Sequence, residues 1–251
     1  YQALTTMNVT NTSDTFNTSV GFRAGRLVTG GVQNTLIGAR CGDAITTGGY
    51  NTLLGMEAGS YSVNLTTGSD NVLIGAYSHT SAADTARAMV LGYNVTGTTD
   101  YTTIGNGAND IRAAHGNTTW ATVSDERYKK DIVDSTAGLS FINALQPRTF
   151  KYKTLGELPE TFRAYVSPDD EEKDSTEVFK NSKTNHGFIA QEVKAAIDAD
   201  SSIKDGFRLW DDRDDGSQEV AEAALIPILV KAVQELSTAL DAALARITEL
   251  E

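Results

Sequence analysis

A short unit built around glycine recurs along the first half of the chain, and it limits the possible folds more than any other feature. In the better copies, three or four β-forming residues lie before the glycine and a polar turn follows. A single unit of this size cannot bury its own apolar side, so successive copies must stack along an axis. The central glycines lie 17, 17, 20, 17 and 13 residues apart, at Gly21, Gly38, Gly55, Gly75, Gly92 and Gly105. The repeat therefore predicts a stacked β-structure over residues 17–110.

The strand before each glycine decides which side chains enter the core, because alternate side chains of a strand point to opposite faces. We expect the residue immediately before each glycine to point inward. In the four best copies these residues are Val20, Ile37, Leu54 and Ile74. A glycine at the same place in every copy fits a tight corner that needs a positive φ or a close backbone approach. Cys41 occupies a corner position that carries alanine in two other copies, so we interpret it as a small buried residue rather than a reactive thiol.

The composition of the chain changes abruptly at Ser124. Residues 1–123 hold 17 of the 22 glycines and no lysine or proline, whereas residues 124–251 hold all four prolines and most of the charged residues. The net charge of the first part is 5 − 7 = −2, and that of the second part is 16 − 26 = −10. Such a change indicates a domain boundary. We therefore predict a repetitive β-structured domain over residues 1–123 and a second domain over residues 124–251.

Charge and composition also argue against several classes of protein. The sequence has no basic stripe that would bind a nucleic-acid backbone. The single cysteine excludes an intrachain disulfide framework and a CxxC metal site, and we expect no metal and no other cofactor. No apolar run approaches the ~20 residues of a membrane-spanning helix, so we expect no membrane insertion. The acidic residues of the first domain are scattered, and no pair of them stands out for glycoside hydrolysis.

The second domain mixes helix and strand patterns. Apolar residues at helical spacing predict a helix over residues 139–145, which Pro147 ends. Residues 149–153 alternate as in a strand, and residues 186–193 are typical of a strand edge that runs into a helix through Val193 and Ile197. The polar segment 154–185 contains an acidic run and predicts a protruding arm.

The last segment, residues 225–251, carries an apolar heptad pattern. One series of apolar residues recurs every seven residues, and a second series follows it with an offset of three. Together they are Ile226, Leu229, Val233, Leu236, Leu240, Ala243, Ile247 and Leu250. The pattern predicts a coiled coil, because an isolated helix of this length is marginal in water. The residue types do not fix the number of strands, and a helix packed within its own domain is the alternative.

Two family resemblances rest on these motifs. The unit Asn-Thr-x-apolar-Gly-x-x-Ala-Gly over residues 17–110 resembles the head repeats of trimeric autotransporter adhesins and the β-structured shafts of phage tail fibres. The second domain carries, in order, Ser-Asp-x-Arg-x-Lys at 124–129, Leu-x-x-Ile-x-x-Leu-x-Pro at 139–147, Gly-Phe-Ile-Ala-Gln-Glu-Val at 187–193 and Leu-Val-Lys-Ala-Val-Gln-Glu-Leu at 229–236. These four motifs closely resemble the C-terminal intramolecular chaperone domain of phage tail spikes and tail fibres.

The resemblance implies a multidomain homotrimer. Its N-terminal part would be repetitive all-β, similar to a β-roll or β-helix, and its α+β chaperone domain would end in a trimeric coiled coil. The chaperone would assemble the β-fold and then remove itself by cutting before Ser124, and arms such as 154–185 would embrace the shaft. The protein would be made in the host cytoplasm and reside in the virion. Its partners would be its own copies and a host-surface receptor, either a glycan or a protein.

The domain boundary also carries residues suited to such a cut. Ser124 Oγ can reach the carbonyl of Val123 through a five-membered ring, and water can hydrolyse the resulting ester. Lys129 can serve as the base only while neutral, and burial on assembly would favour that state. Residues five apart on an ideal helix are about 140° apart, so Ser124 must precede the helix. The alternatives are a plain N-cap for Ser124 and a solvent-exposed side chain for Lys129.

The expected activity is that of a single-turnover serine peptidase of the Ser-Lys type, without turnover on other substrates. Asp125 and Arg127 fit the motif as orienting, capping or salt-bridging residues. By the same resemblance His186 stands where family members often carry a histidine near the cut site, and packing is its alternative role. Three other functions remain open: a permanent trimerisation cap that is not cleaved, a polysaccharide-degrading spike, and a self-cleaving, membrane-tethered transcription factor. The lack of an apolar membrane segment and the net charge of −12 argue against the last.

Overall fold

The structure is a computed structural model that describes residues 2–6, 14–201, 203 and 208–250. It divides into two compact units, residues 1–130 and 131–251, and each unit is described here by itself. The change of composition at Ser124 falls within the first unit, shortly before this division.

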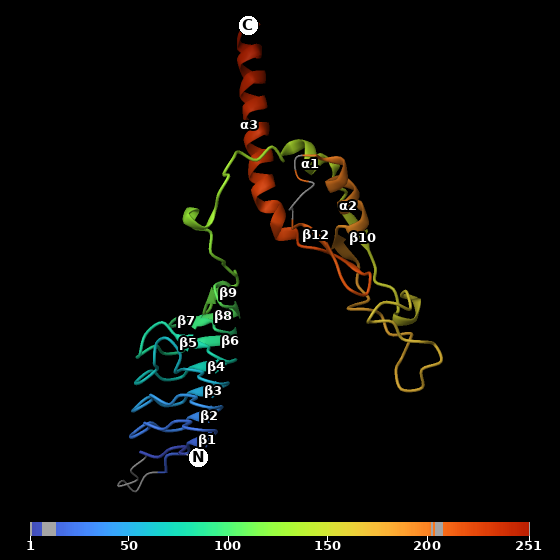
Figure 1. Cartoon of the computed structure of the whole chain (residues 1–251). Helices are drawn as coiled ribbons and strands as arrows, with labels where there is room; N and C mark the ends of the chain where they lie inside the picture. The colour runs from blue at the N-terminus through green and yellow to red at the C-terminus, as the bar shows by residue number, and fades with distance from the viewer. Residues whose placement is uncertain (1, 7–13, 202, 204–207, 251) are drawn as a thin grey trace. The chain divides into compact units, whose positions relative to one another are not determined.

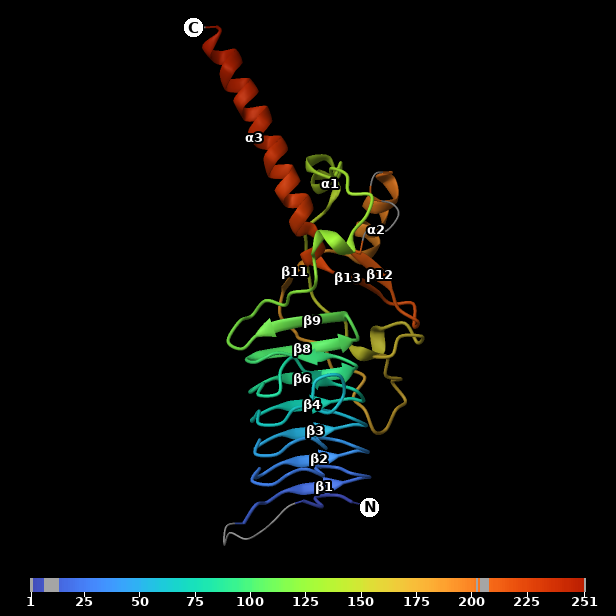
Figure 2. The same cartoon turned by 60° about the vertical axis from the view of Figure 1, so that its left-hand side comes forward.

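The described residues of the first unit build a β-solenoid of about five turns (Figure 1). Its seven-stranded sheet contains β1 (Thr18–Val20), β2 (Thr35–Ile37), β3 (Thr52–Leu54), β4 (Val72–Ile74), β6 (Met89–Tyr93), β8 (Tyr101–Asn106) and β9 (Asn109–Ala114). Neighbouring strands are parallel and in register, except that β9 runs antiparallel to β8 (Figure 2). Strands β5 (His79–Thr80) and β7 (Thr96–Gly97) pair in a second, parallel sheet. The expectation of a repetitive, stacked β-structure is confirmed.

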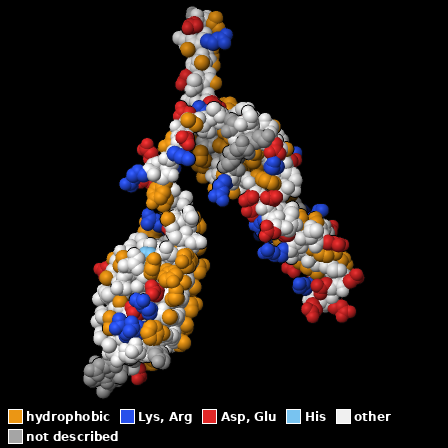
Figure 3. Space-filling view, viewed as in Figure 1, with side chains coloured by type: hydrophobic (Ala, Val, Ile, Leu, Met, Phe, Trp, Pro, Cys, Tyr) orange, Lys and Arg blue, Asp and Glu red, His pale blue; other side chains and the backbone are white. Residues whose placement is uncertain are grey.

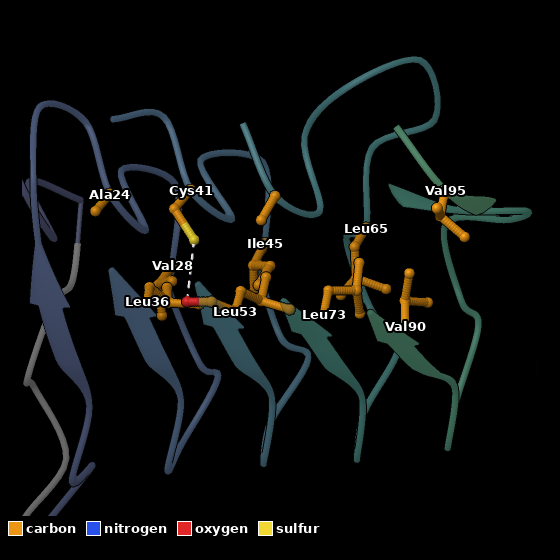
Figure 4. Packing of buried hydrophobic residues seen from close by; sticks show 11 residues of the cluster. Ala24, Val28, Leu36, Cys41, Ile45, Leu53, Leu65, Leu73, Val90 and Val95 are labelled. Carbon is orange, nitrogen blue, oxygen red and sulfur yellow. Dashed lines mark hydrogen bonds between the residues drawn. The ribbon is translucent and has the colours of Figure 1, made fainter. Parts of the chain in front are cut away.

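The register expected for the strands was wrong by one residue. The row that fills the core is Leu36, Leu53, Leu73 and Val90, and each of these side chains is almost completely buried (Figure 4). The residues immediately before the glycines lie on the outer face, with exposed fractions of 58% for Val20, 37% for Ile37, 44% for Leu54 and 36% for Ile74. The four residues share one environment, as expected, but that environment is the solvent-exposed face rather than the core. The physical reason is that β2, β3 and β4 each carry adjacent apolar residues, and two neighbours in a strand cannot both point inward.

Buried asparagines form a ladder at the start of the strands. Asn34, Asn51 and Asn71 are fully buried, and each bonds to the next along the solenoid axis. Asn51 Nδ2 donates to Asn34 Oδ1 and to the Gly68 carbonyl, both at 3.0 Å. Its Oδ1 accepts from the Asn71 backbone N–H at 3.1 Å and from Asn71 Nδ2 at 2.9 Å. The ladder therefore satisfies turn backbone groups that would otherwise be buried without partners.

Two other expectations about the repeat are confirmed. Gly55 has a φ of +137°, and a Cβ at this position would lie 2.6 Å from the backbone carbonyl atoms of Gly75 in the next turn. The repeated glycine thus meets both a positive φ and a close backbone approach. Cys41 is fully buried beside the core row, and its Sγ donates to the Leu53 carbonyl at 3.3 Å (Figure 4). Burial raises the pKa of the Cys41 thiol to about 12, which makes it inert.

The second unit is an α+β structure. Its helices are α1 (Leu139–Ala144), α2 (Ala190–Ala199) and α3 (Ile226–Thr248), and its strands pair antiparallel as β10 (Arg148–Phe150) with β11 (Asn185–Gly187) and β12 (Trp210–Asp212) with β13 (Gln218–Val220). Short 3-10 turns occur at η2 (Leu155–Glu157) and η3 (Glu222–Leu225). The helix expected over 139–145 and the helix expected to follow the strand edge are confirmed as α1 and α2. Phe141, Val193 and Ile197 are the buried side chains through which the two helices join one core cluster.

The polar segment 154–185 connects β10 to β11 and contains η2. Its two ends lie together, since Thr154 pairs with Val178 in an isolated bridge and the Gly156 N–H donates to the Ser175 carbonyl at 2.8 Å. Further along the segment, the Arg163 N–H donates to the Asp215 carboxylate at 3.1 Å, which ties the segment to the turn between β12 and β13. The segment is thus a looped arm with defined contacts. Its predicted embrace of the shaft stays a prediction.

Helix α3 packs one face on α1 and leaves the other in solvent. Ile228 and Ala232 are buried, and the Glu235 carboxylate accepts the Leu139 backbone N–H at 2.8 Å. Glu235 thereby supplies a partner for one of the free N–H groups at the start of α1. Together with η3, α3 is long and apolar enough, by length and composition only, to cross a membrane, which differs from the expectation that no apolar run approaches that length.

Candidate functional site

The predicted cut lies directly after the last segment that is anchored to the solenoid. Ala121 exchanges two backbone hydrogen bonds of 2.8 Å with Arg112 of β9. The Thr122 hydroxyl donates at 2.9 Å to a carbonyl of the same strand. The bond between Val123 and Ser124 follows these anchors, at the point where the chain leaves the β-structure.

A short 3-10 turn, η1 (Glu126–Tyr128), comes next, and Asp125 caps its start. Asp125 is extended, and its carboxylate accepts the Arg127 backbone N–H at 2.8 Å, as N-cap aspartates do. Lys129 ends the turn in an extended conformation, and its N–H donates to the Glu126 carbonyl at 2.8 Å. The chain therefore runs extended, turns once and runs extended again, which lets the Lys129 side chain return to Ser124.

The structure brings the predicted nucleophile and base into contact. The Lys129 ammonium donates a hydrogen bond of 2.8 Å to Ser124 Oγ. Ser124 precedes the helical turn, as the five-residue spacing required. A lysine that acts as a base has to be neutral and accept the hydroxyl proton, and the observed contact holds the two atoms within reach of such a transfer. The catalytic roles of both residues stay predictions.

Asp125 and Arg127 form an ion pair beside this contact. Arg127 Nε and Nη2 donate to the two Asp125 carboxylate oxygens at 2.9 and 2.6 Å. The Arg127 side-chain hydrogen bonds, followed by its backbone N–H, lower the pKa of the Asp125 carboxyl, and Lys129 adds a smaller effect of the same sign. Of the roles left open for these two residues, the structure shows capping and salt-bridging.

The site is open to solvent within a single chain. Ser124 and Lys129 are both exposed, and Val123 is 53% exposed. Desolvation is what disfavours a protonated amine, and none is visible in the described surroundings of Lys129. A neutral base at this position would therefore need a further surface to cover the turn.

His186 lies in the second unit, on β11, and pairs with Thr149 across the β10–β11 ladder. Its side chain is exposed. Its auxiliary role in the cut stays a prediction. Among the described residues, no three His, Cys, Asp or Glu side chains are grouped so that they could hold a metal ion.

The residues of the predicted heptad seam lie along the exposed side of α3, while Glu251 lies outside the described residues. The large seam residues that remain exposed are Ile226, Leu229, Val233, Leu236, Leu240, Ile247 and Leu250. Two further exposed residues, Val230 and Leu244, widen this stripe, and the heptad pattern missed them because each falls one residue beyond a seam position. No described part of the chain covers the stripe, which leaves it available to a partner.

Of three comparisons with known proteins, one gives a match. No curated protein and no solved structure matches the chain. Residues 124–201 match a family model, Peptidase_S74, described as the chaperone of endosialidase. The match begins at Ser124, the residue expected to follow the cut. This family implies, at a coarse level, a self-cleaving serine-type peptidase, and it belongs to phage tail proteins. Residues 124–201 are therefore similar to the chaperone of endosialidase, and this match supports an intramolecular chaperone domain in the second part of the chain.

Proposed function

We propose that this chain is the C-terminal region of a phage tail fibre or spike whose chaperone domain assembles a trimeric β-solenoid and then cuts itself off between Val123 and Ser124. The observation that carries the proposal is the contact between Ser124 Oγ and Lys129 Nζ at 2.8 Å, immediately after the bond to be cut. It occurs at the first residue of the family match. The solenoid fold and the family both fit such a fibre or spike region.

The proposed reaction uses the chain's own atoms and one water molecule. Neutral Lys129 accepts the hydroxyl proton while Ser124 Oγ attacks the Val123 carbonyl carbon. The carbon–nitrogen bond breaks, the Ser124 nitrogen takes up the proton, and Val123 becomes an ester of the Ser124 hydroxyl. Water then hydrolyses this ester and leaves a Val123 carboxylate and a free Ser124 amine. Each chain performs the reaction once.

The exposed position of the turn suggests how cleavage follows assembly. A lysine in water favours the ammonium form, and covering the turn would favour the neutral form. The proposed cover is the assembled trimer, formed in part through the exposed α3 stripe. Cleavage would then report that the shaft is complete, and the separated shaft would owe its resistance to unfolding to kinetics rather than to equilibrium stability.

Intact-mass analysis of the expressed chain tests the cleavage. Wild type should yield two fragments that meet between Val123 and Ser124, and Ser124→Ala should stay whole. Lys129→Ala should cut much more slowly, and Lys129→Arg should not restore cutting, because a guanidinium stays charged. Lys130→Ala is the matched control, since it removes the neighbouring amine and should cut normally. A fragment that begins at residue 124 in the Ser124→Ala protein would end this mechanism.

Light scattering tests the role of α3 in assembly. Replacing Leu229 and Leu236 with Asp should abolish the trimer and, with it, cleavage, because two charges would enter the buried seam. A trimer that persists in this variant would contradict the proposal. Vesicle flotation of the wild type tests the membrane alternative for α3, in which Lys231 and Glu235 would have to enter lipid at a high cost.

The remaining partners belong to the same proposal. The fibre would reside in the virion and bind a glycan or protein receptor on the host surface. A chain that assembles but never cuts would be the permanent trimerisation cap. Release of sugar from a host capsule would instead indicate a polysaccharide-degrading spike.

A further inference from the structure

We propose that the outer face of the solenoid sheet is a second self-association surface, on which the strands of one copy pack against the same strands of neighbouring copies. The inference rests on the proposed trimer and extends it from α3 to the shaft. It arises from the outward residues that the sequence pattern had placed inside.

The outer face carries one large apolar residue in every parallel strand. The row consists of Val20, Ile37, Leu54, Ile74, Leu91 and Ile104, with Leu91 48% and Ile104 37% exposed. The in-register pairing of β1, β2, β3, β4, β6 and β8 places these six residues side by side. Ile111 of β9 pairs with Ile104 and continues the row by one position. Figure 3 shows hydrophobic side chains gathered along one side of the solenoid.

The solenoid does not need this row for its own core. The inward row already fills the interior, and its leucines are fully buried. The outer row, with Ile111, leaves roughly 500 Å² of apolar side chain in solvent, which is at the upper end of the largest patch on a typical monomer. Exposed Met89 and Tyr93 of β6 extend the same face, since they lie two residues from Leu91 in the same strand. The regular repetition of the row on every parallel strand, rather than its size, is what indicates an interface.

The spacing of the row identifies a second copy as the occupant. Adjacent strands lie about 4.8 Å apart, so a partner has to offer apolar side chains at the same interval over six strands. Another copy of this chain offers that interval. In a closed, rotationally symmetric assembly, each residue lies at the same height as its counterpart in the other copies. Leu54 of one copy would therefore lie near Leu54 of the next.

The charge pattern agrees with such self-pairing. A symmetric interface places like residues near one another, so a charged residue close to the axis would face its own charge. The six parallel strands carry no Asp, Glu, Lys or Arg. The charged pairs of the solenoid, such as Arg40 with Glu57 at 3.0 Å, lie in the turns after the strands. The area exposed by the row is below the ~800 Å² per partner of a standard interface, so it would act together with the α3 stripe.

Disulfide cross-linking of the full chain tests the surface. The Ser124→Ala background keeps the chain whole, and Cys41→Ala removes the native thiol and restores the alanine that two equivalent positions carry. In this protein Leu54→Cys should form a covalent dimer under mild oxidation. Its yield should exceed that of the control Asn64→Cys by about tenfold or more, because assembled thiols meet at millimolar effective concentration. Asn64 is exposed and lies outside the sheet.

A second variant measures the energetic role of the row. Leu54→Lys should lower the trimeric fraction in light scattering at low micromolar protein, whereas Asn64→Lys should leave it unchanged. Equal cross-linking of Leu54→Cys and Asn64→Cys in a trimeric protein would overturn this inference and leave the α3 trimer standing. A monomeric Ser124→Ala protein would overturn both. Binding to phosphatidylcholine vesicles that Leu54→Lys abolishes would show that lipid occupies the face, and would also overturn it.

Discussion

The buried asparagine ladder gives a stability prediction whose size follows from its hydrogen bonds. Asn51→Ala removes the four hydrogen bonds that this side chain makes. Two of the four partner groups keep another bond, because Asn34 Oδ1 still accepts the backbone N–H of residue 51 and Asn71 Nδ2 still donates to the Thr85 carbonyl. The Gly68 carbonyl and the Asn71 N–H lose the partner that Asn51 provided.

Each buried polar group left without a partner costs about 1–3 kcal/mol, so Asn51→Ala should lower the free energy of unfolding by roughly 4 kcal/mol. Asn64→Ala is the matched control, because it removes an exposed asparagine of the same solenoid and should change the stability by less than about 0.5 kcal/mol. Two variants that differ only in the burial of the same amide thus separate the hydrogen-bond ladder from the general effect of losing an asparagine.

Urea unfolding followed by circular dichroism measures the difference. Both substitutions belong in the Ser124→Ala background, since separation of the chaperone would make unfolding irreversible. The protomer concentration has to be equal in all samples, because assembly stabilises the folded state by mass action. A loss for Asn51→Ala within about 1 kcal/mol of that for Asn64→Ala would refute the reasoning, because it would mean that water or a shifted turn satisfies the freed groups.

Two further predictions concern a glycine and a carboxylate. Gly55→Ala should destabilise the solenoid by about 3 kcal/mol or more, because its Cβ would meet the Gly75 backbone at 2.6 Å. The control Gly107→Ala should cost only about 1 kcal/mol, because Gly107 has a φ of +58° and open space around it. Equal losses of stability for the two variants in urea unfolding would contradict this prediction. The hydrogen bond from the Ser217 hydroxyl, with help from the Arg163 and Ser217 N–H groups, lowers the pKa of Asp215 to about 2, below its usual 3.8. A lowered folded-state pKa contributes stability above about pH 4 that is lost as the pH falls through about 2, so the NMR shift of the Ser217 amide should titrate near pH 2, and a midpoint at or above 3.8 would count against this contact.

In the repeat, the sequence predicts the stacking of the strands but not which of their side chains enter the core. The glycine spacing was enough to predict stacked strands, because glycine at a corner has a specific backbone reason. Which residues of each strand point to the core could not be predicted in the same way. In Thr35-Leu36-Ile37 both last residues are apolar, so the binary pattern permits either register. At β1 the pattern even misleads, because Val20 points outward while polar Ser19 faces the interior side of the strand.

The asparagine ladder was visible in the sequence but not recognised. Asn17, Asn34, Asn51 and Asn71 open successive copies of the unit, and a polar residue repeated before every strand is a signal for a buried side-chain ladder. The cap that Glu235 provides for α1 had no such signal. Its partner lies 96 residues away in the chain, and only the packing of α3 on α1 brings the two together.

The candidate site was easier to predict, because its residues are close in sequence. The five-residue spacing of Ser124 and Lys129 required Ser124 to precede the helical turn, and in the structure Asp125 caps the start of a turn that follows Ser124. The role of His186 depends on contacts between segments that are distant in the chain, and local pattern says nothing about those.

The antiparallel course of β9 has a consequence for the shaft after the proposed cut. A parallel solenoid that simply stopped would present a row of free N–H and C=O groups, which is a template for adding another molecule end to end. Here the chain turns back after β8, and Ala121 pairs with Arg112 on the far side of β9. These residues precede the cut and stay with the shaft. The separated shaft would therefore end in a strand whose free edge is partly covered, which disfavours end-to-end addition of further molecules.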